Sequence, residues 1–145
     1  MMLLVVDGNS ALETAPQELA IASDADVVRT RQAVRAFALK ASLSIVDQTK
    51  IVTAASELAR NTLIHGGGGS ARLELLQDGK RKAVRATFID SGPGIPDMEL
   101  AMSGGYTTAG GLGLGLSGSR RLVDEFEVET KVGSGTRVTV TKWTR

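Results

Sequence analysis

Glu57-Leu58-Ala59-Arg60-Asn61 lies within residues 47–65, where apolar residues recur at the spacing of an amphipathic helix. Glu57 and Asn61 are four residues apart, so their side chains project from one face of that helix. At about 100° per residue, both fall at the edge of the apolar stripe, which consists of Ile51, Ala54, Ala55 and Leu58. A carboxylate beside a carboxamide at such an edge indicates a cation site or an acid–base pair. An ordinary polar helix margin has the same pattern, so other parts of the sequence are needed to distinguish a functional pair from such a margin.

The composition excludes several kinds of site. The 145 residues are enough for one domain with its own core. They include no cysteine and one histidine, so disulfides, thiol nucleophiles and multi-histidine metal sites are not available. A net charge of +1 and five aromatic residues (three Phe, one Tyr, one Trp) give no reason to expect a nucleic-acid partner. The first apolar run is far shorter than the roughly 20 residues that span a bilayer. We therefore expect a cytoplasmic protein without a membrane segment.

The order of predicted elements indicates the fold class. Residues 1–16 form an N-terminal extension of unclear role, and residues 17–145 form a single domain. Ser23 or Asp24 is expected to cap the first helix and Asp47 the second. The predicted strands are 17–22, 70–77, 82–90, 126–132 and 136–143, and the predicted helices are 24–42, 47–65, 97–102 and 114–125. Two hairpins flanking the later helices predict an α+β fold. We expect a two-layer α/β sandwich, in which helices cover one face of a mostly antiparallel, mixed sheet.

An acidic residue ends the strand at 82–90. A period of two places Asp90 on the same face as Val84, Ala86 and Phe88, so its carboxyl group needs a partner. Gly92 and Gly94 follow within a turn that also holds two prolines. Such a turn has little side-chain bulk and would let a flat ligand approach the backbone.

The segment Gly111-Leu112-Gly113-Leu114-Gly115 precedes the predicted helix at 114–125. Glycine-rich turns that open a helix can bind phosphate through free N–H groups and the helix dipole. No Lys-Ser/Thr pair follows, so this is not a Walker loop, and no βαβ unit makes it a Rossmann fingerprint. Taken alone, the segment could equally be a flexible packing loop.

The motifs together resemble a known family. Residues 57–61 resemble the N box of the GHKL ATPases, 90–94 their first glycine box and 111–115 their second, and Gly135-Thr136 opens the last strand. The resemblance covers roughly residues 17–143 and implies the Bergerat fold. Within the superfamily, the chain is similar to bacterial switch-protein kinases of the RsbT type and, more distantly, to anti-sigma factors of the SpoIIAB type.

The resemblance implies ATP and Mg²⁺ as cofactors and a role for each motif residue. Asp90 would accept a hydrogen bond from the adenine amino group, and Thr136 would hold the same edge. Asn61 would ligate Mg²⁺. Glu57, taken as exposed and ionised at neutral pH, would be the catalytic base for the attacking hydroxyl. The glycines would approach the ligand, with Gly92 and Gly94 at the base and Gly111, Gly113 and Gly115 at the phosphates.

The function implied is an ATP-dependent protein serine/threonine kinase of a partner-switching pathway. Its substrate would be a STAS-domain antagonist or stressosome scaffold protein, with a phosphatase or a sigma factor as a further partner. An alternative is an anti-sigma factor or regulatory binding module without kinase turnover, and simple ATP hydrolysis is a third. SpoIIAB-type kinases have an arginine where this chain has Gly111, so a cation for the terminal phosphate would have to be Arg60, Arg120 or Arg121. These arginines could also be solvated helix charges or partner contacts.

Overall fold

Seven strands and four helices make up the described part of the protein, a computed structural model in which residues 5–6, 10–12, 15–102 and 115–145 are described. The strands are β1 (Val5–Val6), β2 (Ser10–Leu12), β3 (Gln17–Ile21), β4 (Gly69–Asp78), β5 (Arg81–Asp90), β6 (Glu125–Lys131) and β7 (Gly135–Trp143). The helices are α1 (Asp24–Lys40), α2 (Ile45–Ile64), α3 (Met98–Met102) and α4 (Gly115–Arg121).

The strands form one sheet in the order β1-β2-β4-β5-β7-β6, and β3 also pairs with β4. Every pairing among the described strands is antiparallel. The last strand in the sequence, β7, lies between β5 and β6 rather than at the edge. This order brings the end of β5 beside the start of β7, with Asp90 opposite Thr136.

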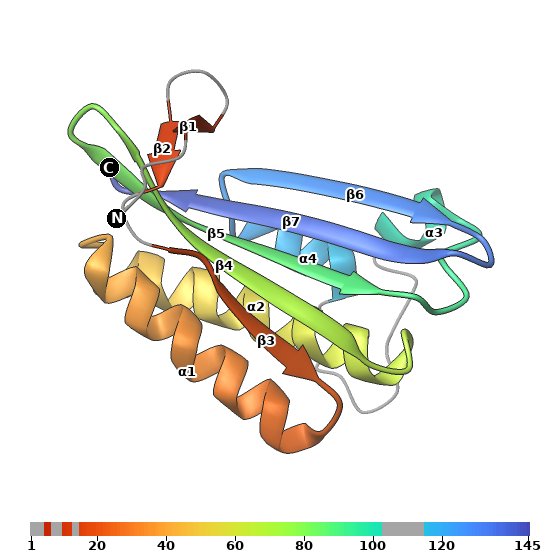
Figure 1. The fold of residues 1–145 in the computed structure, drawn as a ribbon. Helices are drawn as coiled ribbons and strands as arrows, with labels where there is room; N and C mark the ends of the chain where they lie inside the picture. Colours follow the sequence, from red (N-terminus) through yellow and green to blue (C-terminus); the bar gives the residue numbers. More distant parts are fainter. Residues whose placement is uncertain (1–4, 7–9, 13–14, 103–114) are drawn as a thin grey trace.

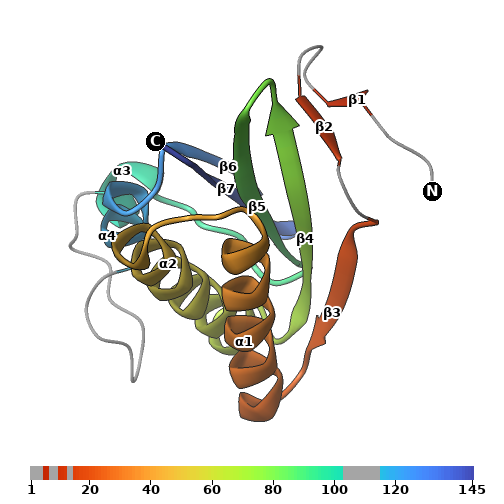
Figure 2. The same ribbon diagram turned by 90° about the vertical axis from the view of Figure 1, so that its left-hand side faces the viewer.

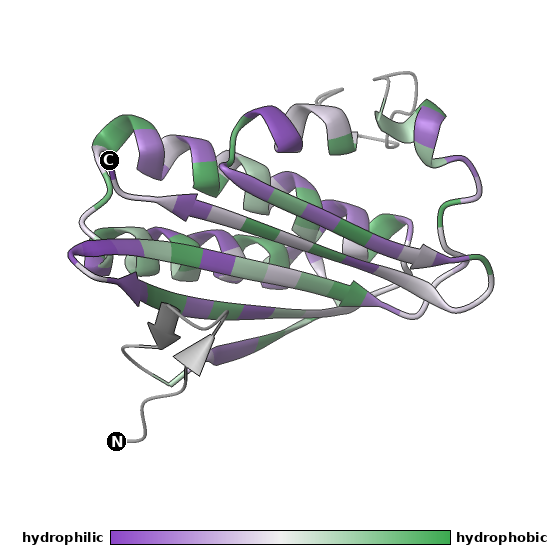
Figure 3. Ribbon diagram, turned by 90° about the horizontal axis from the view of Figure 1, so that it is seen from above, coloured by the Kyte–Doolittle hydropathy of each residue, from purple (hydrophilic) through white to green (hydrophobic). Residues whose placement is uncertain are grey.

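The helices pack on one face of the sheet, so the molecule has two layers (Figures 1 and 2). The alternation of hydrophobic and hydrophilic residues along the strands is visible in Figure 3. In β5 the residues Val84, Ala86 and Phe88 are buried, as their period of two predicts. They belong to the same hydrophobic core cluster as Ile51, Ala55 and Leu58 of the α2 stripe. Ala54 of that stripe is buried as well. The predicted α+β two-layer sandwich, with helices on one face, is confirmed.

Serine residues cap both long helices. Ser23, one of the two residues predicted for this position, caps α1. Its side chain accepts a hydrogen bond from the Asp26 amide. For α2 the prediction of Asp47 as the cap is wrong. The cap is Ser44, whose hydroxyl accepts from the Asp47 amide at 3.1 Å, so the helix begins two residues earlier than expected.

The helix predicted at 114–125 is shorter in the structure, where α4 ends at Arg121. The chain turns there because the Leu122 amide donates to the Ser119 carbonyl, and the Asp124 amide then donates to Thr141 of β7 at 2.9 Å. This bond aligns the next residue with the sheet, so β6 begins at Glu125.

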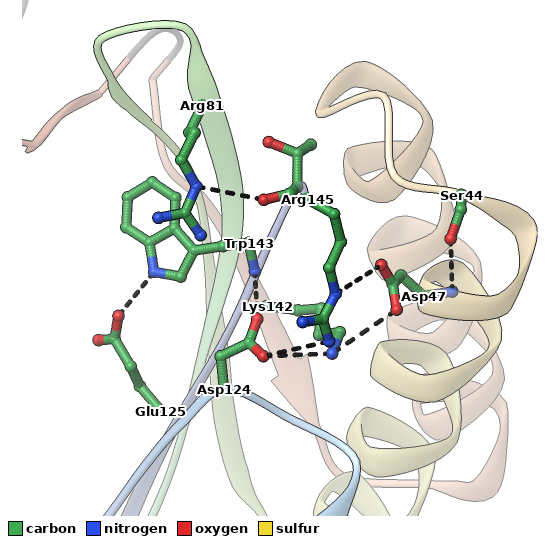
Figure 4. Close-up of polar contacts among 9 residues, drawn as sticks. Ser44, Asp47, Arg81, Asp124, Glu125, Lys142, Trp143 and Arg145 are labelled. Carbon is green, nitrogen blue, oxygen red and sulfur yellow. Dashed lines mark hydrogen bonds and ion pairs between the residues drawn. The ribbon is translucent and has the colours of Figure 1, made fainter.

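A partly buried ion-pair cluster connects the beginning of α2 to the end of β7 (Figure 4). The Lys142 ammonium is almost fully buried and lies 3.6 Å from Asp47 Oδ1 and 3.3 Å from Asp124 Oδ1. Arg145 lies 3.8 Å from each of the same two carboxylates. Asp124 also accepts from the Trp143 amide at 2.8 Å. Four charges of alternating sign therefore hold helix and strand together at this end.

Strand β2 extends the sheet before the expected domain start, since it pairs with residues 76–77 of β4. Strand β3 pairs with residues 69–73 of the same strand. The division of the chain into an extension (1–16) and a single domain (17–145) stays a prediction.

Candidate functional site

A pocket of about 90 Å³ lies at the end of the helix layer opposite the ion-pair cluster. It is several times larger than the roughly 15 Å³ that one water molecule needs. It is lined by Leu58, Asn61, Thr62, His65, Gly66, Phe88, Asp90, Pro93, Gly94, Ile95, Leu116, Thr136 and Val138. The walls are mostly apolar and the polar groups are few, which is the usual character of a small-molecule site.

Four residues that were predicted from three separate motifs meet at this pocket: Asn61, Asp90, Gly94 and Thr136. They come from α2, the end of β5, the turn after it and the start of β7. The strand register explains the meeting, because Asp90 pairs with Thr136 across β5 and β7. Directly opposed residues of antiparallel strands project from the same face.

The Asp90 carboxylate is held from two sides. Its Oδ1 accepts a hydrogen bond from the Gly92 amide at 2.9 Å. Its Oδ2 lies against Gly66, where a Cβ atom would be 2.7 Å from that oxygen and 2.4 Å from the Asp90 Cγ. The carboxylate can keep its position beside the pocket only because residue 66 has no side chain.

Gly92 and Gly94 are required by the packing of the protein itself. A Cβ on Gly92 would lie 2.7 Å from the Cα of Gly66. Gly94 has φ +79°, and a Cβ there would lie 2.5 Å from the Lys131 carbonyl oxygen. The turn therefore packs closely against both Gly66 and the β6–β7 hairpin.

Glu57 and Asn61 each carry a buried side-chain oxygen. Among the described residues, neither Glu57 Oε2 nor Asn61 Oδ1 has a hydrogen-bond partner. Buried acceptors of this kind are costly unless something binds them. The expectation of an exposed Glu57 is wrong, since the residue is 5% exposed. Glu57 lies one helical turn before Asn61 and is not among the residues that line the pocket.

The second glycine motif is only partly described. Gly111 and Gly113 lie outside the described residues, and Gly115 begins α4 with φ +54°. Arg120 and Arg121 are exposed and Arg60 is half-buried, and none of these arginines lines the pocket.

Some residues of the pocket were missed by the motifs. Leu58 and Phe88 were expected only as members of apolar faces, yet they form its apolar walls together with Leu116. Ile95, Leu116 and Val138 each lie within three residues of a glycine in one of the motifs, so they could have been found by asking which apolar residues follow these glycines. Gly66 gave no such signal, because it stands first in a run of four glycines.

Residues 46–144 match the family model described as histidine kinase-, DNA gyrase B- and HSP90-like ATPase. The chain belongs to this ATPase family. The GHKL assignment made from residues 57–61, 90–94 and 111–115 is thereby confirmed, and with it the use of ATP.

Similar proteins narrow the position of the chain within the GHKL ATPases. It is 42% identical to the serine/threonine-protein kinase RsbT of Bacillus subtilis (strain 168) over 125 residues, covering 86% of this chain and 94% of RsbT. It is 34% identical to the anti-sigma F factor of Thermoanaerobacter sp. (strain X514), covering 78% of this chain and 82% of that protein.

A solved structure has a similar fold. The chain holding the RsbU and RsbW domains of a Mycobacterium tuberculosis protein matches with a TM-score of 0.62 and 25% identity. The match covers 89% of this chain, which spans about a third (32%) of that longer chain. Among the described helices, none is both long and hydrophobic enough to cross a membrane.

Proposed function

We propose that this GHKL ATPase is a serine/threonine-protein kinase of a partner-switching pathway, and that it transfers phosphate from Mg-ATP to a STAS-domain antagonist or stressosome scaffold protein. Similarity to RsbT over most of both chains supports the kinase class. The observation that carries the proposal for the site is the pair of unpartnered buried oxygens on Glu57 and Asn61, next to the pocket that holds Asp90.

In this proposal the adenine base lies between the apolar walls of the pocket, and its amino group donates to Asp90. Asp90 Oδ1 is already occupied by the Gly92 amide, so Oδ2 is the acceptor for the ligand. Thr136 hydrogen-bonds the same edge, and Gly92 and Gly94 let the base approach their backbone. Gly111, Gly113 and Gly115 bind the phosphates.

Asn61 fits a magnesium ligand. Its unpartnered Oδ1 is a hard oxygen donor, and Mg²⁺ in nucleotide sites is commonly held by one or two protein oxygens together with phosphates and waters. Within the part of the chain that the structure describes, no cluster of three or more His, Asp or Glu could hold a metal by itself. When bound, the ion neutralises charge on the phosphates.

Glu57 is the proposed base. It accepts the proton of the partner's serine or threonine hydroxyl as that oxygen forms a bond to the terminal phosphorus, and the bond to ADP breaks. Because phosphoryl transfer depends mainly on alignment and charge neutralisation, a fixed carboxylate acts chiefly by orienting the hydroxyl. Burial among packed helix residues provides that fixed position.

Two substitutions test the roles of Glu57 and Asn61 separately. Glu57→Gln should leave the dissociation constant of Mg-ATP within about twofold of wild type and lower phosphate transfer to a candidate STAS protein by about 10²- to 10⁴-fold. Asn61→Ala should weaken Mg-ATP binding itself. Binding is measured by calorimetry and transfer with labelled ATP. Transfer at the wild-type rate by Glu57→Gln would disprove the base assignment.

A second candidate function is an anti-sigma factor or regulatory binding module, which the similarity to the anti-sigma F factor favours. In that case the protein acts by holding its partner, and nucleotide only sets its shape. A stoichiometric complex with a sigma factor that persists in Asn61→Ala without ATP would favour this function. Its absence, together with ATP-dependent transfer to the STAS protein, would favour the kinase.

The proposal includes a location in the cell and a second partner. A cytoplasmic location fits a chain without cysteine. A phosphatase or a sigma factor would be the partner exchanged when the substrate is phosphorylated.

A further inference from the structure

Strand β6 forms an open edge of the sheet. It is the outermost strand on its side and, among the described strands, pairs only with β7 (Figure 1). Every second residue of an edge strand directs its backbone N–H and C=O groups away from the neighbouring strand, so these groups can pair with another chain. At one end of β6 the Ile95 amide donates to the Thr130 hydroxyl at 2.9 Å. Gly94 packs closely against Lys131 there. This turn limits the edge that is open to another chain to residues 125–129.

The two faces of β6 differ in character. Exposed glutamates lie on the face of the sheet that carries no helix in Figures 1 and 2, namely Glu125, Glu127 and Glu129. Phe126 and Val128 alternate with them, are half-buried and pack against the hydrophobic core. Opposed residues of neighbouring strands project from the same face, so a strand placed beside β6 continues the alternation. Its side chains would meet carboxylates on one face and half-exposed apolar groups on the other.

The three glutamates differ in the cations that the protein itself provides. The Arg85 guanidinium lies 3.8 Å from the Glu125 carboxylate. Arg137 donates a hydrogen bond to the Glu129 carboxylate at 2.6 Å. Glu127 lies between these two glutamates and, within the part of the chain that the structure describes, has no ion-pair partner. The middle of the edge therefore carries a negative charge that a cation from another chain can neutralise.

A second copy of this chain does not fit the edge. Two β6 strands that paired with each other would bring their glutamates together, and like charges directly opposite one another destabilise a sheet. The other described strands that pair on only one side, β1 and β3, hold no basic residue. The complementary segment therefore belongs to a different protein.

We propose that residues 125–129 bind an extended segment of a partner protein, in which basic and apolar residues alternate, as an additional strand of the sheet. The backbone groups of the edge provide the hydrogen bonds that hold the strand. Its basic side chains pair with the three glutamates, and its apolar side chains cover Phe126 and Val128. No residue of β6 lines the nucleotide pocket, so the inference does not rest on the proposed function.

Synthetic peptides test the pattern of the segment. The probe is a capped seven-residue peptide of alternating Lys and Val that begins and ends with Lys. One control peptide has the same composition with all its Lys in one block, and a second has the alternating sequence with every amide N-methylated, which removes the N–H donors. Fluorescence anisotropy at low ionic strength measures binding to the wild-type protein, and amide chemical shifts of isotope-labelled protein locate it. We expect the alternating peptide to bind about tenfold more tightly than either control and to shift the amides of β6.

Charge substitutions test the edge. Glu127→Lys replaces an attractive cross-strand pair by a repulsive one and should weaken binding of the alternating peptide about fivefold. Glu18→Lys is the matched control, because it makes the same change of charge at an exposed position of β3 and should leave the affinity within about twofold of wild type. Thermal unfolding shows whether each variant is folded, and Glu127→Gln, with an expected loss of about twofold, replaces a Glu127→Lys protein that is not.

Each other result overturns the proposal. Equal affinity for the alternating peptide and either control peptide does so, as does an absence of binding at millimolar concentrations of the alternating peptide. An equal loss in Glu127→Lys and Glu18→Lys would attribute binding to net charge, and shifts confined to amides outside β6 would place it elsewhere. Shifts of the β6 amides that depend on protein concentration without peptide would make a second copy the occupant. A failure of the protein to bind nucleotide changes none of these outcomes.

Discussion

At Gly66 the protein has room for a hydrogen atom and for nothing larger. A Cβ there would lie 2.4 Å from the Asp90 side chain, a distance that packed atoms do not reach. The φ angle of Gly66 is not in the left-handed region, so an alanine would be compatible with the backbone. The whole effect of a substitution therefore falls on the Asp90 carboxylate.

We predict that Gly66→Ala displaces this carboxylate and weakens ADP binding. A hydrogen bond to a charged group contributes about 1.5–3 kcal/mol, so the expected loss is roughly 10- to 100-fold in affinity. Calorimetry with ADP measures it.

The neighbouring glycine provides the control. Gly67 has φ +73°, and a Cβ on this residue would have no described atom within 4 Å. Asparagine tolerates that backbone conformation. Gly67→Asn should therefore bind ADP as the wild type does. Equal affinity of Gly66→Ala and Gly67→Asn would show that the contact with Asp90 does not control binding.

Asp90 and Gly66 differ in how far the sequence alone could predict them. Asp90 was predicted because an acid in an apolar period of two stands out within its own strand. Gly66 could not be found in that way. Its importance arises from its contact with Asp90, 24 positions further along, which only the folded chain brings near.

Among the elements, helix α2 connects the ion-pair cluster at its beginning to the pocket at its end. Its beginning is held by the Ser44 cap and by the ion pair from Asp47, and its last turns carry Asn61 and the pocket wall. The helix is 20 residues long, so the rise of 1.5 Å per residue separates its ends by about 30 Å. Changes at the beginning should therefore alter stability without altering the pocket.

We predict that Ser44→Ala lowers the free energy of unfolding by about 0.5–2 kcal/mol, because the Asp47 amide loses its capping acceptor. ADP affinity should stay within about twofold of wild type. Urea unfolding and calorimetry measure the two quantities. Ser44→Asp keeps a capping acceptor and should restore most of the stability, and a loss of the same size in Ser44→Asp would contradict the capping explanation.

Element boundaries were predicted less well than element types. The helix periodicity identified α1. Two valines follow each other there, and only Val27 is buried while Val28 is 40% exposed, because adjacent helix positions are about 100° apart. The ends of α2 and α4 depend on a serine cap and on the Asp124–Thr141 bond across the sheet. The second of these contacts is not local, so no pattern in the helix itself could place it.

At the scale of the whole molecule, the ion-pair cluster of Figure 4 makes stability depend on pH. Partial burial tends to raise the pKa of Asp124, but the Trp143 amide and the Lys142 ammonium, with a contribution from Arg145, outweigh it and hold the pKa below its ordinary value of 3.8. A carboxyl group with a lowered pKa in the folded state stabilises the protein above its unfolded pKa. That stability is lost as the pH falls through the lower folded value.

We predict that Asp124→Asn lowers the free energy of unfolding at pH 7 and that the difference from wild type shrinks as the pH falls below about 4. Asparagine keeps an oxygen for the Trp143 amide, so the change removes mainly charge. Urea unfolding at a series of pH values measures the difference.

The control replaces an exposed carboxylate. Glu129 pairs with Arg137 at the surface and is 64% exposed, so Glu129→Gln should change stability little at any pH. A difference between Asp124→Asn and wild type that stays constant from pH 7 to pH 3 would contradict the electrostatic explanation.

The overall architecture was predictable because each hairpin and each amphipathic helix carries its own local pattern. The motif order then indicated the GHKL family, and the pairing of Asp90 with Thr136 follows once that fold is assumed. The burial of Glu57 depends on how the helices pack against the sheet, and the sequence alone did not predict it.

The position of β7 between β5 and β6 has a consequence for synthesis on the ribosome. The chain is made from its N-terminus, so β5 and β6 emerge before the strand that must lie between them. Until residues 135–143 have left the exit tunnel, β5 has an open edge and β6 has no partner in the sheet. Helices α1 and α2 with β3–β5 can associate earlier, but the pocket lacks Thr136. The pocket of the nascent protein is therefore complete only after the final strand has inserted between β5 and β6.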